Sequence, residues 1–475
     1  MASSKKKNNV THPSSEIKST TSKKCSILWG VFRLTAVSSI VGAVALKRYV
    51  SHGSFTPWTC SVFGHECDRL YNVPFNGYVH EDYTAAQEVF KQNFFSGEEV
   101  GAATAAYVDG ELVLDIQGGW QNREKKIPYT DKTLQMVFSS TKALTSIVVA
   151  QFVEKGVLSY DEKISTYWPE FAQGNKENVT LGDLMQHAAG VGYLDNGVTA
   201  AEAEDPERFS RILAEQPHIF GGIRQRSYHA TTRGWYINEI LKRVAGCTVN
   251  DVAAELNEKY GIEWNLRPFE EKYDDRISLF YMAPNTIRLA RIIEQLGIKR
   301  FVHAILNPDE NMKKTGASLP DGVKISDFPS LRLRRIEGPS YSGHTNARSI
   351  AKLAAMMANR GKAIVEGEPD LLKTETYDFV TESVPLDYDI LFRRTLDFVR
   401  GGWGNHDDFE VEGVQFVGWP GLGGSTFLWN DEYKIGFAYH MNGITTVKSP
   451  DDRSMSILSA IVKEVSKKKN NNSNV

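Results

Sequence analysis

Ser139 and Lys142, three positions apart, are the residues of this sequence best placed for covalent chemistry. Ser139 follows the apolar run 136–138, and Lys142 precedes residues 143–153, which are apolar on nearly every face and therefore predict a buried helix. Residues three apart share one face of a helix, so we expect the lysine amine beside the serine hydroxyl. Burial favours the neutral amine, which can accept the serine proton, and the unpaired N–H groups of a helix start can stabilise an oxyanion. The pattern predicts a serine nucleophile with a lysine base; the alternative is an N-cap serine beside a lysine that reaches solvent.

The Ser-x-x-Lys spacing alone is weak, because the chain contains six such pairs. Four of them lie in polar terminal segments, and Ser349 with Lys352 lies further inside its own helix, where we expect surface residues. Other catalytic patterns are missing from the sequence: there is no Gly-x-Ser-x-Gly, His-Glu-x-x-His or Cys-x-x-Cys motif and no phosphate-binding glycine loop. No metal ion or organic cofactor is therefore predicted.

Four short stretches, taken in order, resemble one family. They are Phe138-Ser139-Ser140-Thr141-Lys142, followed by a buried helix and Gly156-Val157-Leu158; residues 179–190; Tyr228-His229-Ala230; and the run Gly418-Trp419-Pro420-Gly421-Leu422-Gly423-Gly424. Together they resemble the serine β-lactamase and penicillin-binding-protein family. The resemblance is to its class C-like branch, which includes esterases, D-amino-acid peptidases and eukaryotic β-lactamase-like proteins. It covers about residues 84–465.

The resemblance implies roles for several residues. Ser139 would attack a carbonyl carbon, while Lys142 and Tyr228 would move protons. The strand that contains Trp419 and Gly421 would line the site, and the N–H of Leu422 would complete an oxyanion hole with the N–H of Ser139. His187 is expected to support a helix and not to react.

The sequence also departs from the family pattern at two positions. Ala230 stands where the family has an asparagine that holds a substrate amide, and Trp419 stands where it has a lysine or histidine. An indole offers no charge to a substrate carboxylate, so we expect a poor β-lactamase that prefers uncharged esters or amides. Arg348 is a candidate for the missing cation. The literal Lys314-Thr315-Gly316 and Tyr236-Ile237-Asn238 motifs lie in unsuitable contexts, and we reject both.

The elements around these motifs predict an α+β fold. Residues 84–95 predict a helix, and residues 102–108 and 111–117 predict a hairpin around Asp109-Gly110. A second hairpin is expected at 425–429 and 434–441, followed by a last amphipathic helix with its apolar face on Met455, Leu458, Ile461, Val462 and Val465. Since residues 140–380 are mostly helical in pattern, we expect one antiparallel sheet built from both ends of the domain, with a large helical insertion. The resemblance implies the serine β-lactamase/DD-peptidase-like fold.

The ends of the chain differ from its body in charge. The 475 residues have a net charge of −3, but residues 1–48 hold nine Lys or Arg and one acid, and residues 466–475 hold three Lys, which leaves −14 for residues 49–465. A body that acidic excludes nucleic acid as a partner. Residues 1–24 and 466–475 are expected to be disordered tails and residues 48–83 a linker. Cys60 and Cys67 could close a small loop in an oxidising lumen or remain unpaired.

Residues 26–46 contain one charge, Arg33, and are long enough for a bilayer core. We expect a single-pass signal anchor, at 25–47, with the body on the non-cytosolic side of the membrane. A cleaved signal peptide and a mitochondrial presequence are the alternatives. The predicted protein is thus a membrane-tethered serine hydrolase acting through an acyl-serine intermediate on a small ester, amide or peptide. The alternative is an inactive scaffold that retains the fold.

Overall fold

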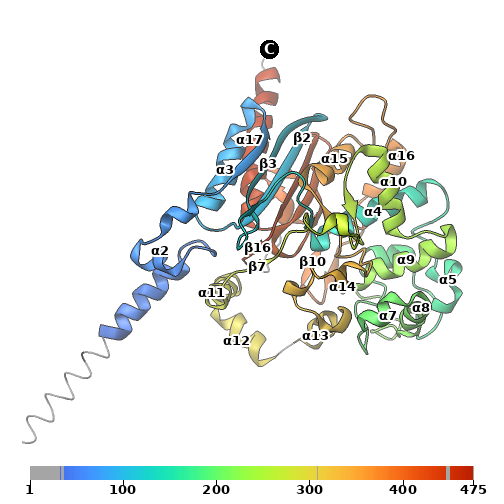
Figure 1. Cartoon of the computed structure of the whole chain (residues 1–475). Coiled ribbons are helices and arrows are strands. Elements are labelled where there is room, and N and C mark those ends of the chain that lie inside the picture. The colour runs from blue at the N-terminus through green and yellow to red at the C-terminus, as the bar shows by residue number, and fades with distance from the viewer. Residues whose placement is uncertain (1–32, 34–36, 308, 446–449, 474–475) are drawn as a thin grey trace, which may run out of the picture. The chain divides into compact units, whose positions relative to one another are not determined.

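A computed structural model describes residues 33, 37–307, 309–445 and 450–473 of the chain (Figure 1). The chain divides into two compact units, one of residues 1–52 and 57–66 and the other of residues 53–56 and 67–475. In the first unit, residues 37–50 are helical and α2 spans Trp58–Phe63. The predicted tail 1–24 lies outside the described residues. Cys60 and Cys67 are both disulfide-bonded, and Cys247 is a free thiol.

The prediction of a single-pass membrane protein is wrong. Residues 26–32 and 34–36 of the proposed anchor lie outside the described residues. Within the described ranges, no helix is long and apolar enough to cross a bilayer, which needs about 20 mainly apolar residues. The helical stretch 37–50 already includes Lys47 and Arg48, so its apolar part is too short. The membrane partner and the non-cytosolic location inferred from this segment are overturned with it.

A seven-stranded antiparallel sheet forms the centre of the second unit and joins both ends of the sequence. Its order is β1-β3-β2-β15-β14-β13, with β4 paired to β3. Asp109 and Gly110, at φ of 53° and 82°, form the tight turn between β2 and β3, as the sequence predicted. The strands are β1 Phe75–Val79, β2 Gly101–Val108, β3 Glu111–Asn122, β4 Ile127–Pro128, β13 Val417–Pro420, β14 Thr426–Asn430 and β15 Ile435–Met441.

Helices cover both faces of this sheet (Figure 1). The predicted first and last helices, α3 (Thr84–Phe95) and α17 (Asp452–Ser473), pack against each other on one side. On the other side α15 (Ala347–Ala358) lies directly on β15. A Cβ at Gly436 would lie 2.2 Å from the backbone N of Ala355, so the absence of a side chain there allows this close approach.

Most helices of the insertion between the two sheet halves lie beyond α15, whereas the two helices within residues 285–306 lie apart from that layer (Figure 1). Its helices are α4 Thr141–Glu154, α5 Ile164–Tyr167, α6 Leu181–Met185, α7 Ala200–Glu204, α8 Pro206–Glu215, α9 Thr232–Ala245, α10 Val249–Tyr260, α11 Asn285–Leu296, α12 Ile298–Leu306, α13 Glu310–Ala317, α14 Leu331–Arg334 and α16 Thr374–Thr381. Short strands connect them: β5 Gln135–Met136, β6 Trp264–Asn265, β7 Tyr281–Met282, β8 His344–Thr345, β9 Asp387–Asp389, β10 Arg394–Leu396, β11 Glu410–Val411, β12 Val414–Gln415 and β16 Gly443–Ile444.

The predicted α+β architecture is confirmed, but two of its predicted limits are wrong. Strand β1, within the predicted linker 48–83, pairs with β3 and belongs to the sheet. Helix α17 continues to Ser473, so residues 466–473 are helical and not a disordered tail. Lysine is a good helix former, so the helix extends beyond its buried apolar face.

Candidate active site

Ser139 lies in a tight 3₁₀ turn, Phe138–Ser140, between β5 and α4. The sequence predicted it in the first turn of the buried helix, and the structure places it in the turn just before. Phe138 has a φ of 46°, a conformation that costs a non-glycine residue free energy and needs support from its surroundings. Its buried ring supplies that support by packing on Phe280, with ring centroids 4.9 Å apart. The strained turn leaves Ser139 half-buried at the surface of a cavity.

Two predicted residues, one three positions away and one in a distant part of the sequence, contact the Ser139 hydroxyl. Tyr228 Oη donates a hydrogen bond to Ser139 Oγ at 2.7 Å. Lys142 Nζ lies 3.3 Å from the same oxygen. Two groups that can carry protons therefore contact one half-buried hydroxyl.

Lys142 is removed from solvent, with 1% of its surface exposed. Its amine donates to the backbone carbonyls of Ala230 at 2.6 Å and Ser340 at 2.9 Å. Burial holds the pKa of Lys142 well below its usual value, and the positive charge of Arg233 lowers it further. Because Arg233 Nη2 also donates to the Lys142 carbonyl at 2.8 Å, this charge is fixed beside the lysine backbone.

Tyr228 is buried among aromatic rings. Its ring stacks on Trp419 at 5.6 Å between centroids, and the Lys142 amine lies 4.8 Å from the ring centre. Burial raises the pKa of Tyr228 to about 12, although hydrogen bonds to Ser139 and Trp419 act in the opposite direction. At neutral pH the tyrosine is thus a protonated phenol, while the shift at Lys142 favours a neutral amine.

The glycine turn after β13 approaches the Ser139 backbone closely. A Cβ at Gly421 would lie 2.2 Å from the Val137 carbonyl oxygen and 3.1 Å from the Ser139 nitrogen. Only glycine fits at that distance, and the Gly421 N–H is fixed by a 2.7 Å bond to the Ser425 carbonyl. Leu422 follows and begins a 3₁₀ turn, Leu422–Gly424. Ser139, Gly421 and Leu422 line one cavity.

A buried charged cluster supports this turn from behind. Arg453 Nη2 donates to the Gly423 carbonyl at 2.6 Å, and its Nη1 lies 3.0 Å from the Glu99 carboxylate. Asp451 also pairs with the Arg453 guanidinium, at 2.5 Å. Burial nevertheless raises the pKa of Glu99 to about 8, and the Arg453 charge opposes that rise. The N-terminal end of α17 is therefore connected to the turn that contains Leu422.

The cavity at Ser139 has a volume of about 180 Å³ and a largely aromatic wall. Trp419 is 5% exposed and stacks on Phe398, with ring centroids 5.3 Å apart. Arg348 does not supply the missing cation, because it pairs with Asp115 at 2.9 Å and is absent from the cavity lining. The cavity does contain another arginine, Arg394.

Arg394, Phe392 and Arg233 are site residues that the sequence reasoning missed. Arg394 lines the cavity and forms an ion pair with Asp408. Phe392, in the turn between β9 and β10, packs on Tyr228 with ring centroids 4.9 Å apart. The sequence around Phe392 and Arg394 contains no recognisable motif. Arg233 lies in a helix, and only the tertiary structure shows that this helix is buried. Among the described residues, no three His, Cys, Asp or Glu side chains are grouped as a metal site would require.

The remaining residues singled out from the sequence make packing, ion-pair or hydrogen-bond contacts that do not involve the Ser139 hydroxyl. His187 is fully buried and packs edge-on against Tyr228 at 4.8 Å between centroids, which fits a supporting position. Lys314 pairs with Asp195 at 3.0 Å on α13, and Tyr236 Oη donates to the Leu213 carbonyl at 3.0 Å. Ser349 is 5% exposed, so its prediction as a surface residue is wrong. Its hydroxyl accepts from the Glu263 N–H, which keeps it away from Lys352.

Comparison with known proteins identifies a family model and relatives that this chain resembles. Residues 86–256 match the family model described as Beta-lactamase. The esterase/beta-lactamase LipL of Mycobacterium tuberculosis is 27% identical over 266 residues, which are 55% of this chain and 59% of LipL. The chain thus spans less than two thirds of that relative.

Two solved structures share the fold over most of the chain. A penicillin-binding protein homologue from Caulobacter crescentus is 25% identical with a TM-score of 0.69, and the match covers 82% of this chain and all of the homologue. A family VIII carboxylesterase is 23% identical with a TM-score of 0.71 and the same coverage. The predicted β-lactamase/penicillin-binding-protein-like fold is confirmed.

Proposed function

We propose that this chain, which belongs to the serine β-lactamase family, is a serine hydrolase that works through an acyl-serine intermediate. The observation that carries the proposal is the pair of contacts on Ser139 Oγ, from Tyr228 at 2.7 Å and from a desolvated Lys142 at 3.3 Å. A hydroxyl needs an adjacent base to become a good nucleophile, and a neutral buried amine is such a base.

In the proposed acylation step, Ser139 Oγ attacks the substrate carbonyl carbon while its proton passes to the neutral Lys142 amine. The carbonyl oxygen becomes an oxyanion that accepts hydrogen bonds from the N–H groups of Ser139 and Leu422. The Tyr228 phenol, protonated at neutral pH, donates its proton to the leaving group and regains one from the Lys142 ammonium. The bond to the leaving group breaks, and an ester remains on Ser139.

Deacylation runs the same proton transfers in reverse order. Water takes the place of the leaving group, and the amine of Lys142, assisted by Tyr228, removes a proton from it. The resulting oxyanion occupies the same two N–H groups, after which the Ser139–acyl bond breaks and the serine regains its proton. No further co-reactant is required.

We propose that the substrates are esters or amides without a carboxylate beside the reacting carbonyl. Trp419 presents an aromatic wall there, and a carboxylate against it would lose water without gaining a cation. Arg394, the cation within the cavity lining, is neutralised by Asp408. The relative LipL, named an esterase/beta-lactamase, supports ester hydrolysis as the first activity to assay.

The test is covalent labelling with a fluorophosphonate, followed by mass spectrometry of the labelled peptide. Wild type should be labelled on Ser139, and Ser139→Ala should lose the label with an unfolding free energy within about 1–2 kcal/mol of wild type. Ser349→Ala is a matched control, since Ser349 and Lys352 have the same spacing without the contact. Label retained by Ser139→Ala would place the nucleophile elsewhere. A wild-type protein that takes no label and hydrolyses no nitrophenyl ester would favour the alternative, a binding protein that keeps the fold.

A further inference from the structure

The cavity at Ser139 is smaller than a usual site for a drug-sized ligand. Its volume is about 180 Å³, whereas sites for drug-sized ligands usually measure about 300–1,000 Å³. A substrate larger than this cavity must therefore extend through its open side. Phe392 is 46% exposed and lies with Arg394 on the β9–β10 hairpin, which forms one wall of the cavity.

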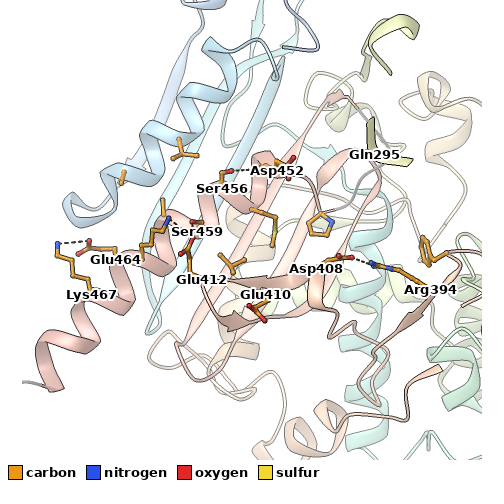
Figure 2. A pocket seen from close by; sticks show the side chains of 18 of the residues that line it. Gln295, Arg394, Asp408, Glu410, Glu412, Asp452, Ser456, Ser459, Glu464 and Lys467 are labelled. Atoms are coloured by element: carbon orange, nitrogen blue, oxygen red, sulfur yellow. Dashed lines mark hydrogen bonds and ion pairs between the residues drawn. The ribbon is translucent and has the colours of Figure 1, made fainter. Parts of the chain in front are cut away.

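A larger cavity begins at this wall. It measures about 1360 Å³ and shares the lining residues Phe392 and Arg394 with the cavity at Ser139, so the β9–β10 hairpin borders both spaces. We call it the α17 groove, because residues 452–467 of α17 form its longest side. Figure 2 shows its labelled side chains running from Arg394 and Asp408 at one end to Glu464 and Lys467 at the other. Sixteen helical residues rise roughly 22 Å, which is the length of an extended segment of about six or seven residues.

The charged side chains that line the α17 groove include more carboxylates than cations. Acidic residues outnumber basic ones by five to three, and the basic residues all pair within the groove. Glu410, on β11, is exposed, and the ion pairs of the described residues do not include it. The ion pairs of the three basic residues in the groove are Arg394 with Asp408, Lys463 with Glu412 at 3.1 Å, and Lys467 with Glu464 at 3.5 Å.

Apolar side chains also line the α17 groove. Val411 and Met455 lie beside the carboxylates, and Val89 and Leu296 contribute from α3 and α11. A long acyl chain would use the apolar surface but would desolvate the charged side chains beside it without binding them. A peptide alternates polar backbone with side chains and can use both kinds of surface. The surplus of carboxylates repels acidic peptides and attracts basic ones.

We propose that the α17 groove binds the part of the substrate remote from the scissile bond, and that this part is an extended peptide with basic side chains. The inference rests on the proposed hydrolase function, because the substrate would run past Phe392 and Arg394 from the reacting carbonyl at Ser139 to its remote segment in the groove. Glu410 is the residue that reads the positive charge. The groove thereby selects among substrates that the small cavity at Ser139 cannot distinguish.

The experiment compares nitrophenyl esters in wild type and variants. The substrates are nitrophenyl acetate and three nitrophenyl esters of an acetylated pentapeptide ending in glycine, with two Lys, two Gln or two Glu residues. We expect kcat/KM in the order Lys, Gln, Glu, and Glu410→Lys should lower the value for the Lys ester about three- to tenfold, as for an exposed ion pair replaced by repulsion. Nitrophenyl acetate should be unaffected. The matched control is Glu375→Lys, a charge reversal at an exposed site on α16.

A steric variant tests the path itself. Ser456 is exposed on the groove side of α17, and Ser456→Trp should lower kcat/KM for every peptide ester while leaving nitrophenyl acetate unchanged. If Ser456→Trp slows nitrophenyl laurate but not the peptide esters, the groove accepts acyl chains and the proposal is wrong. Equal values for the Lys and Glu esters, or no effect of Glu410→Lys, would also overturn it.

Failure of the proposed hydrolase function is recognised separately. In that case wild type hydrolyses none of the esters and takes no fluorophosphonate label. The groove is then tested by fluorescence anisotropy of the fluorescein-labelled Lys peptide with Ser139→Ala. Saturable binding that weakens in Glu410→Lys supports the groove, and absence of binding overturns it.

Discussion

The neutral state proposed for the Lys142 amine can be tested through protein stability, independently of catalysis. The unfolded chain holds this lysine protonated up to a pKa of about 10.4, whereas burial favours its neutral form in the folded protein. The unfolded state then binds one more proton, so the contribution of Lys142 to stability rises with pH until about 10.4 and falls as the pH decreases. Where the folded protein holds Lys142 neutral, linkage gives a limiting slope of about 1.4 kcal/mol per pH unit.

The assay is urea unfolding of wild type and Lys142→Met at pH 7, 8 and 9. The difference in the free energy of unfolding between the two proteins cancels all other titrating groups. It should move in favour of wild type as the pH rises, by at most about 1.4 kcal/mol for each pH unit. Lys352→Met serves as the control, because Lys352 forms an ion pair with Glu368 at 2.6 Å and lies outside the lining of the cavity at Ser139.

A pH-independent difference would mean that folded Lys142 stays protonated, and the reasoning about its role as base would fail. The pH dependence of activity is a second test of the protonation state of Lys142. In wild type, kcat/KM should rise with pH through the pKa of Lys142 and then stay level, because the pKa of Tyr228 is about 12. Burial lowers the pKa of His229 and His406 to about 3, so neither can produce a rise near neutral pH.

Three further predictions concern the groups around Ser139. Tyr228→Phe should lower kcat about 10²- to 10⁴-fold with little change in KM, in single-turnover assays, because a proton donor to the leaving group is lost; an unchanged kcat would remove that role. Trp419→His should raise kcat/KM for a carboxylate-bearing cephalosporin relative to a neutral nitrophenyl ester, since it introduces a charged hydrogen-bond donor; a wild type that already prefers the cephalosporin would contradict our account of Trp419. Arg453→Met should cost about 3–5 kcal/mol in urea unfolding, because it leaves the Asp451 carboxylate buried without its cation and removes the partner of the Glu99 carboxyl; among folded molecules kcat should fall more than KM changes, and Arg453→Lys should recover part of it.

The parts of the site that could be predicted are set by local sequence. Ser139 and Lys142 are three residues apart at the head of an apolar segment, so helix geometry alone brings them together. Asp109-Gly110 fixes a hairpin through its backbone conformation, which does not depend on distant residues. Gly421 could be placed near the serine only through the order of the motifs along the chain. Its physical reason, the 3.1 Å between its missing Cβ and the Ser139 nitrogen, required the structure.

The parts that could not be predicted depend on tertiary burial. Arg233 reads as an ordinary helical arginine, and only the packed structure shows that it is 1% exposed beside Lys142. Arg394 and Phe392 lie on a short hairpin with little apolar alternation, so nothing local marks them as walls of a cavity. The edge strand β1 is exposed at its three central positions, which removes the alternation that predicts a strand. The proposed anchor at 26–46 was judged by composition, whereas a span also requires an uninterrupted apolar helix.

The two departures from the family pattern affect substrate contacts and leave the groups around Ser139 in place. At position 230 the asparagine side chain is absent, but the backbone carbonyl still holds the Lys142 amine at 2.6 Å. At position 419 the cation is replaced by an indole, but the strand still delivers Gly421 to the Ser139 backbone. The side chains that the resemblance assigns to substrate contact differ from the family pattern, while the backbone groups and proton carriers proposed to act on the carbonyl agree with it. A chain losing its activity would have no reason to keep a buried lysine, which costs folding free energy at neutral pH. We therefore expect the difference from β-lactamases to lie in which molecules reach Ser139, and not in whether Ser139 reacts.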